Sequence, residues 1–187
     1  TLDVGSGALG TPRQVATTPA PSFLAHGLTD DVLYAVNEQS EGTLTAFVPD
    51  QDSPRRIGDA ATGGEDPCHL LVHQGSAALV ANYSSGTLGL IPLDPRGAPG
   101  RERLQVCSFQ GSGPDTERQA TSHAHYVLPT ANPADVLVVD LGADCVRRIR
   151  ISPGGGLQDE GIAVEFPPGT GPRHAEFSAD GALLYVL

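Results

Sequence analysis

The fold is decided by Pro67-Cys-His-Leu-Leu-Val72 and the apolar run after it, Ala78-Leu-Val-Ala-Asn-Tyr83, because this pair recurs along the chain. The other copies pair Pro21-Ser-Phe-Leu-Ala-His26 with Val32-Leu-Tyr-Ala-Val-Asn37, His123-Ala-His-Tyr-Val-Leu128 with Val136-Leu-Val-Val-Asp140, and Pro172-Arg-His-Ala-Glu-Phe177 with Leu183-Leu-Tyr-Val-Leu187. A recurrence at roughly 40–50 residues is typical of proteins that build one small sheet per repeat. The repeat therefore predicts the architecture before any single residue does.

Each repeat reads as antiparallel strands joined by tight turns. Continuous apolar runs, such as Val136 to Val139, predict strands buried on both faces. Alternating segments such as Val146-Arg-Arg-Ile-Arg-Ile151 predict strands with one face in solvent. The 16 prolines and 23 glycines interrupt the chain too often for long helices. We therefore expect an all-β chain in which four-stranded blades stack radially, a β-propeller.

The repeats divide residues 1–187 into the blades of a single, partial β-propeller domain. We expect nearly whole blades at 19–65, 66–121 and 122–171, the end of an earlier blade at 1–18, and the start of a further blade at 172–187. Three blades and parts of two more cannot close a ring, since propellers have at least about four blades. The sequence, which contains no methionine, is therefore expected to be a piece of a longer protein.

Composition narrows the partners and the compartment. A net charge of −11 argues against nucleic acid, whose phosphates favour a basic surface. No apolar stretch reaches the about 18 residues of a membrane span, so we expect no membrane partner. Cys68, Cys107 and Cys145 are odd in number and lack CxxC spacing, which indicates reduced cysteines in a cytoplasmic protein. The absence of tryptophan excludes the Trp-Asp signature of interaction propellers.

Histidines occupy the first strand of successive repeats, which in a propeller lines the central channel. They are His69, His123, His125 and His174. In an unbroken strand His123 and His125 would point to one face, because they are two residues apart. We interpret them as a catalytic acid or base with an orienting partner; the alternative is a pair that bonds neighbouring backbone. A metal site would need a third ligand such as His69 or His174, and we expect neither a metal nor another cofactor.

Arg173 is the second candidate for catalysis. It lies in Gly171-Pro-Arg-His174, after a Pro-Pro-Gly turn. A fixed guanidinium there would clamp a carboxylate or phosphate, or stabilise an oxyanion. The alternative is a structural ion pair with Asp140 or Glu176.

The predicted substrate-binding residues are His69, Arg118 and His174. Arg118 lies on the insertion 111–118, from which it could reach over the channel, although arginines in such loops are more often solvated. For His69, the alternative is a turn at the start of a strand. Glu38, at the end of an inner strand, reads either as a solvated cap or as a wall of the site.

Six motifs occur in one order along the chain. They are Gly64-Glu-Asp-Pro-Cys-His69, Ala81-Asn-Tyr-Ser-Ser-Gly86, Gly111-Ser-Gly-Pro114, Arg118-Gln-Ala-Thr-Ser-His-Ala-His125, Asp140-Leu-Gly-Ala-Asp144 and Gly171-Pro-Arg-His174. Together they resemble the seven-bladed β-propeller lactonases, the family of the cyclase-type 6-phosphogluconolactonase and the fungal carboxymuconate cyclase. The resemblance covers nearly the whole chain and implies that about half of the family's length is present.

The resemblance implies an enzyme that hydrolyses a small anionic sugar lactone, with 6-phosphogluconolactone as the leading substrate. It assigns catalysis to a His of the His-x-His strand, here His123 or His125, and to Arg173; the family's Glu and second Arg have no counterpart within these residues. The same His and Arg could instead serve a carboxymuconate cycloisomerase. A third reading is a propeller without catalysis that binds a small anionic ligand.

Overall fold

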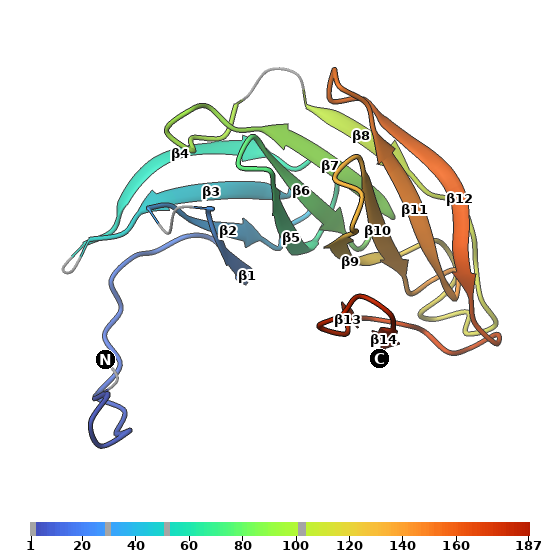
Figure 1. The fold of residues 1–187 in the computed structure, drawn as a ribbon, viewed down its shortest axis with the longest axis horizontal. Coiled ribbons are helices and arrows are strands. Elements are labelled where there is room, and N and C mark those ends of the chain that lie inside the picture. Colours follow the sequence, from blue (N-terminus) through green and yellow to red (C-terminus); the bar gives the residue numbers. More distant parts are fainter. Residues whose placement is uncertain (1–2, 29–30, 51–52, 101–103) are drawn as a thin grey trace.

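The computed structural model describes residues 3–28, 31–50, 53–100 and 104–187. Within these ranges the chain forms strands and no helix, arranged as three four-stranded antiparallel sheets and one two-stranded sheet. The sheets stand side by side in an arc, with β1, β5 and β9 along its inner side and β4, β8 and β12 along its outer side (Figure 1). The expectation of an all-β, incomplete propeller of four-stranded blades is confirmed.

Strand order within each sheet follows the order of the sequence. The first sheet contains β1 (Pro21–His26), β2 (Leu33–Asn37), β3 (Thr43–Val48) and β4 (Arg55–Ala61). The second contains β5 (Pro67–His73), β6 (Ala77–Asn82), β7 (Thr87–Pro92) and β8 (Gln105–Ser108). The third contains β9 (Ala124–Pro129), β10 (Asp135–Asp140), β11 (Cys145–Ile151) and β12 (Leu157–Glu165). The fourth pairs β13 (Ala175–Phe177) with β14 (Leu184–Val186).

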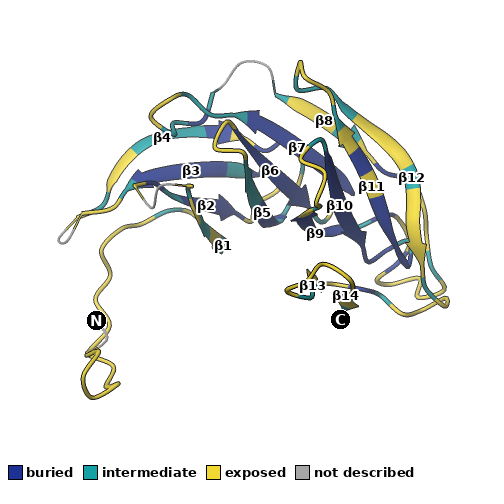
Figure 2. Ribbon diagram, in the orientation of Figure 1, coloured by how far each residue is buried: buried dark blue, intermediate teal, exposed yellow. Residues whose placement is uncertain are grey.

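Each sheet lies inside one of the blade ranges expected from the repeat, and the blade boundaries themselves stay a prediction. Residues 3–18, expected as the end of an earlier blade, contribute to none of these strands, while residues 1–2 lie outside the described part of the chain. The segment runs away from the sheets and is mostly exposed (Figures 1 and 2). Near the end of the segment, the Thr18 hydroxyl donates a hydrogen bond to Asn37 Oδ1 at 2.7 Å.

The core lies between neighbouring sheets, so the second strand of a blade is buried on both faces. In β6 every residue is buried. Leu79 and Ala81 pack toward the third sheet, and Ala78 and Val80 toward the first. This explains the uninterrupted apolar run, because a strand covered on both sides has no polar face. The outer strands β8 and β12 are the more exposed ones in Figure 2.

Gly89 shows how closely adjacent blades approach. It lies in the middle of β7, where a glycine costs stability unless another backbone comes near. A Cβ atom built at Gly89 would collide with the backbone carbonyl of Thr62, in the connection after β4. The missing side chain therefore sets the distance between the first and second blades.

A β-bulge recurs near the start of each inner strand. The register skips Ser22 between β1 and β2, Cys68 between β5 and β6, and His125 between β9 and β10. The fourth sheet shows a related irregularity, since the backbone N–H groups of both Arg173 and His174 donate to the carbonyl of Leu187. A bulge places one extra residue in a strand and re-aims its side chain. The repeated bulge therefore marks one position per blade that departs from regular alternation.

Candidate active site

A cavity of about 280 Å³ collects residues from the first three sheets, from segments beside their strands, and from the segment before β13. It is lined by Ser22, Glu38, Cys68, Tyr83, Arg118, His125, Leu141 and Arg173. Ser22, Cys68 and His125 are the bulged residues of the inner strands. The residues that directly follow β2, β6 and β10 are Glu38, Tyr83 and Leu141. The cavity is therefore built by equivalent positions of successive repeats, at one end of the inner strands.

At this cavity His125 and Arg173 are joined by a hydrogen bond. The Nε–H of Arg173 donates to His125 Nε2 at 3.1 Å. Because Nε2 accepts, the neutral ring carries its proton on Nδ1, and this buried atom has no hydrogen-bond partner within the described ranges. Burial, with the charge of Arg173 and nearby His174, lowers the pKa of His125 to about 4. The imidazole is therefore neutral at pH 7 and able to take up a proton.

Asp140 fixes the start of the strand that carries His125. Its Oδ1 accepts from the backbone N–H groups of His123 (2.9 Å) and Ala143 (3.1 Å), and the second bond forms an Asx-type turn. Its Oδ2 accepts from the hydroxyl of Ser122 at 2.6 Å and from Arg147 Nε at 3.0 Å. Asp140 thus pairs with Arg147, and Arg173 is left for His125.

The other three histidines in the predicted site do not line the cavity. His123 precedes β9; its Nδ1 lies 2.9 Å from the carbonyl oxygen of Tyr83, and its ring stacks on the Tyr83 ring at 4.4 Å. This is the backbone-bonded alternative considered for the pair.

His69 is buried in β5, between the rings of Phe23 and Tyr126, and its Nδ1 accepts from the backbone N–H of Val127 at 3.3 Å. Burial, together with His174 and His125, lowers its pKa to about 3. His174 lies edge-on to His125 at 5.2 Å, on a different cavity lined by Phe23, Tyr126 and Tyr185. Of the three predicted substrate-binding residues, Arg118 lines the cavity beside His125, whereas His69 and His174 do not.

Cys68 is a thiol that supports the site without acting as a nucleophile. Its Sγ donates to the carbonyl oxygens of His125 (3.3 Å) and Ala124 (3.6 Å). Burial, followed by the negative charge of Glu38, raises its pKa to about 12. A thiolate is the nucleophilic form of cysteine, and at this pKa it is scarcely populated at neutral pH.

Glu38 is the one carboxylate among the residues that line the cavity, and it is exposed, so it is solvated and also forms part of the cavity wall. Tyr83 is not among the predicted site residues, and a place in the site is only one of the two interpretations given for Glu38. The sequence did hold a signal for both, because each directly follows the second strand of its repeat.

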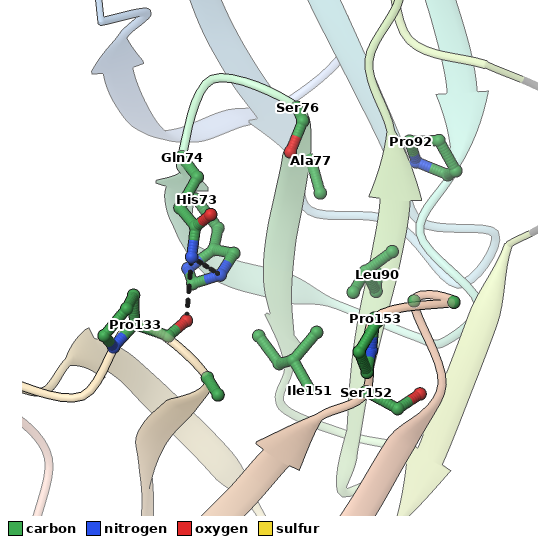
Figure 3. A pocket seen from close by; sticks show the side chains of 13 residues that line it. His73, Gln74, Ser76, Ala77, Leu90, Pro92, Pro133, Ile151, Ser152 and Pro153 are labelled. Carbon is green, nitrogen blue, oxygen red and sulfur yellow. Dashed lines mark hydrogen bonds between the residues drawn. The ribbon is translucent and has the colours of Figure 1, made fainter.

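A larger cavity, about 460 Å³, lies at the opposite ends of the strands, between the second and third blades (Figure 3). Its lining contains no Asp, Glu, Lys or Arg, and burial lowers the pKa of His73 there. Gln74 crosses it to donate to the carbonyl of Pro133 at 2.9 Å. The arginines are found only at the smaller of these two cavities, which makes that cavity the better match for an anion. Among the described residues no His, Cys, Asp and Glu cluster of three or more is arranged to hold a metal.

Residues 1–187 match the family model described as a lactonase with a seven-bladed β-propeller. The chain belongs to this lactonase family. A structure of the periplasmic gluconolactonase of Pseudomonas aeruginosa is 31% identical, with a TM-score of 0.88 over 99% of this chain and 55% of that one.

Curated members of the lactonase family are similar along nearly the whole chain. The 6-phosphogluconolactonase of Bacillus subtilis is 30% identical over 190 residues, covering 100% of this chain and 53% of that protein. The 6-phosphogluconolactonase of Formosa agariphila is 27% identical over 175 residues, covering 89% and 49%. The chain thus spans about half the length of the curated relatives it matches. In the parts that the structure describes, we find no helix with the length and apolar character that crossing a membrane requires.

Proposed function

We propose that the full-length protein is a lactone hydrolase whose substrate is a sugar lactone with an anionic group, 6-phosphogluconolactone first among them. The observation that carries the proposal is the pair formed by neutral His125 and Arg173 on a cavity that Arg118 also lines. The names of the curated lactonases support the same reaction. None of the relatives cited here is named a cycloisomerase, so that alternative is not favoured.

In the proposed reaction His125 acts as the base. A water molecule bonded to its Nε2 would attack the lactone carbonyl carbon while its proton passes to the imidazole. The ring C–O bond then breaks, and the imidazolium returns the proton to the departing oxygen. This gives the open hydroxy acid and regenerates neutral His125.

Arg173 has two tasks in this scheme. In the structure its Nε–H occupies the lone pair of His125 Nε2, so the hydrogen bond must open before a water can be activated there. A guanidinium has five N–H donors in a fixed fork, which can turn to the carbonyl oxygen as negative charge develops. Substrate binding would thus exchange an Arg173–His125 contact for an Arg173–oxyanion contact.

A binding module without catalysis would keep the cavity and lose the reaction. The test is hydrolysis of 6-phosphogluconolactone by the full-length protein, measured against the uncatalysed rate and against His125→Gln, which removes the base. We expect acceleration by the wild type and near-background rates with the variant. Binding of the lactone without acceleration would support the binding module instead.

We also propose a cytoplasmic setting, supported by Cys68, Cys107 and Cys145, which are all free. Since the related enzyme of P. aeruginosa is periplasmic by name, cell fractionation decides the point. Nucleic acid and membrane surfaces are not proposed as partners, given the net charge of −11.

A further inference from the structure

One buried carboxylate joins the two loops that bring arginines to the cavity. Asp144 directly precedes β11 and is 5% exposed. Its Oδ1 accepts hydrogen bonds from Gln119 Nε2 and from the backbone N–H of Gly171, both at 2.7 Å. Its Oδ2 accepts from the backbone N–H of Gly169, also at 2.7 Å. The three donors come from two segments, 25 to 27 residues away from Asp144 in sequence.

The first segment is the insertion that carries Arg118. Gln119, next in sequence, is 2% exposed, and its Nε2 also donates to the carbonyl of Leu141 at 2.9 Å. Its backbone carbonyl accepts from Gly113 at 2.9 Å, which closes the insertion on itself. The buried Gln119 side chain therefore anchors the exposed insertion at the residue next to Arg118, which lines the cavity.

The second segment connects β12 to β13 and carries Arg173. Gly169 and Gly171 adopt positive φ angles of 85° and 58°, so their backbone N–H groups can both turn toward the Asp144 carboxylate. Gly171 is two residues before Arg173. The Asp144 backbone carbonyl accepts from Phe166 at 2.9 Å, at the other end of this connection.

We propose that Asp144, with Gln119, is the positioning residue that sets both arginines of the site, an inference that rests on the proposed function for its catalytic consequence. Asp140 is the first residue and Asp144 the last residue of one motif, and each holds a different part of the site. Asp140 holds the strand of His125, while Asp144 holds the loops of Arg118 and Arg173. The relative position of base and cations then depends on one turn of five residues.

Asp144 is suited to this task because it stays ionised. Burial alone would raise its pKa, but the hydrogen bonds from Gly171, Gly169 and Gln119 outweigh that effect and lower it. Bonds to an ionised acceptor are shorter and roughly twice as strong as bonds between neutral groups. An asparagine at this site would keep one acceptor and turn an N–H₂ group toward the N–H donors that now face the other oxygen.

The variant that tests the proposal is Asp144→Asn in the full-length protein. Asp135→Asn is the matched control, since Asp135 is also buried and lies at the opposite end of the same blade. The first readout is solvent exchange of the Arg173 Nε–H by NMR, assigned through its loss in Arg173→Lys. We expect at least a tenfold faster exchange in Asp144→Asn, and no change in Asp135→Asn. Unchanged exchange in a folded Asp144→Asn protein overturns the proposal, whether or not the wild type hydrolyses a lactone.

The second readout is catalysis in a double-mutant cycle. Asp144→Asn should lower kcat/KM by about 10–100-fold in the wild type, as displaced catalytic groups do. In a background that lacks both arginines (Arg118→Ala with Arg173→Ala) the same change should cost less than about threefold, because Asp144 then has neither arginine to position. Full additivity in that background would contradict the proposal. If Asp144→Asn does not fold, Gln119→Met replaces it. This change should raise KM when Arg118 is present and leave KM unchanged in an Arg118→Ala background. Equal effects in both backgrounds reject the proposal.

An inactive wild type would reject the proposed function, and the exchange measurement would still decide the role of Asp144.

Discussion

Arg173 Nε donates to His125 Nε2 at 3.1 Å and so joins the inner edges of the third and fourth blades. The two residues are 48 positions apart, which is one repeat of the sequence. Because the two residues belong to different blades, this contact forms only when adjacent blades are packed against each other. The predictions that follow depend on this contact and on the residues around it.

Removal of Arg173 should stop catalysis without unfolding the protein. Arg173→Ala is expected to lower kcat at least 10²-fold, as the loss of one oxyanion donor often does. Arg173→Lys should restore little, because a lysine lacks the planar fork of donors. Steady-state kinetics measures both, and Arg148→Ala, an exposed arginine of β11, is the control. Wild-type turnover in a folded Arg173→Ala protein would remove Arg173 from the mechanism.

The pH dependence of kcat/KM should show an acid limb near pH 4, where His125 becomes protonated. The neutral form is the base, so activity is present above this pKa and is lost as pH falls through it. An imidazole in water would place the limb near about pH 6.5.

The same lowered pKa makes a statement about stability. In the unfolded state His125 takes up a proton at about pH 6.5, whereas in the folded state it does so only at about pH 4. Between these values the unfolded state binds more protons, so the free energy of unfolding falls as pH falls across this window. Circular dichroism at each pH is needed to show that the protein used for kinetics is folded. An acid limb near 6.5 in folded protein would contradict a buried catalytic His125.

Arg118 should contribute to the binding of the anionic group more than to the chemical step. It is exposed and it lines the cavity. Among the described residues, no hydrogen bond joins it to His125. Arg118→Ala is expected to raise KM for 6-phosphogluconolactone about tenfold and to change kcat little. The uncharged gluconolactone serves as the control substrate, with an expected change below about twofold. Equal losses on both substrates would show that Arg118 does not read the phosphate.

Arg147 should matter for stability through Asp140. This pair is buried, with the Arg147 side chain 8% exposed and the Asp140 side chain 0% exposed. Arg147→Met leaves a buried carboxylate without its cation and is expected to cost about 3–5 kcal/mol. Arg150→Met breaks ion pairs of an arginine that is 47% exposed and should cost at most about 1 kcal/mol. Urea unfolding compares the two variants; similar losses would show that burial of the Asp140 pair is not what counts.

The repeat predicted the sheets well because each blade is a local structure. Strands, turns and buried runs such as Val136 to Val139 depend on neighbours within about 45 residues, and hydrophobic pattern reports them directly. The end of an earlier blade expected at 1–18 had no such pattern: residues 3–18 include exposed Val4 and Leu9 and join none of the strands. Their placement depends on what packs against them, which the sequence of the segment does not encode.

The sequence by itself determined the recurring strands, and it predicted that a histidine and an arginine of successive repeats would lie together, as His125 and Arg173 do. Only the tertiary structure decided which histidine. Alternation along an unbroken strand would aim His123 and His125 alike, but the bulge at His125 adds one residue to β9 and leaves His123 outside the strand, stacked on Tyr83. A shift of one residue changes the face on which a side chain lies. Because a bulge is fixed by pairing and packing with neighbouring strands rather than by residue type, no reading of His-Ala-His could have distinguished the two rings.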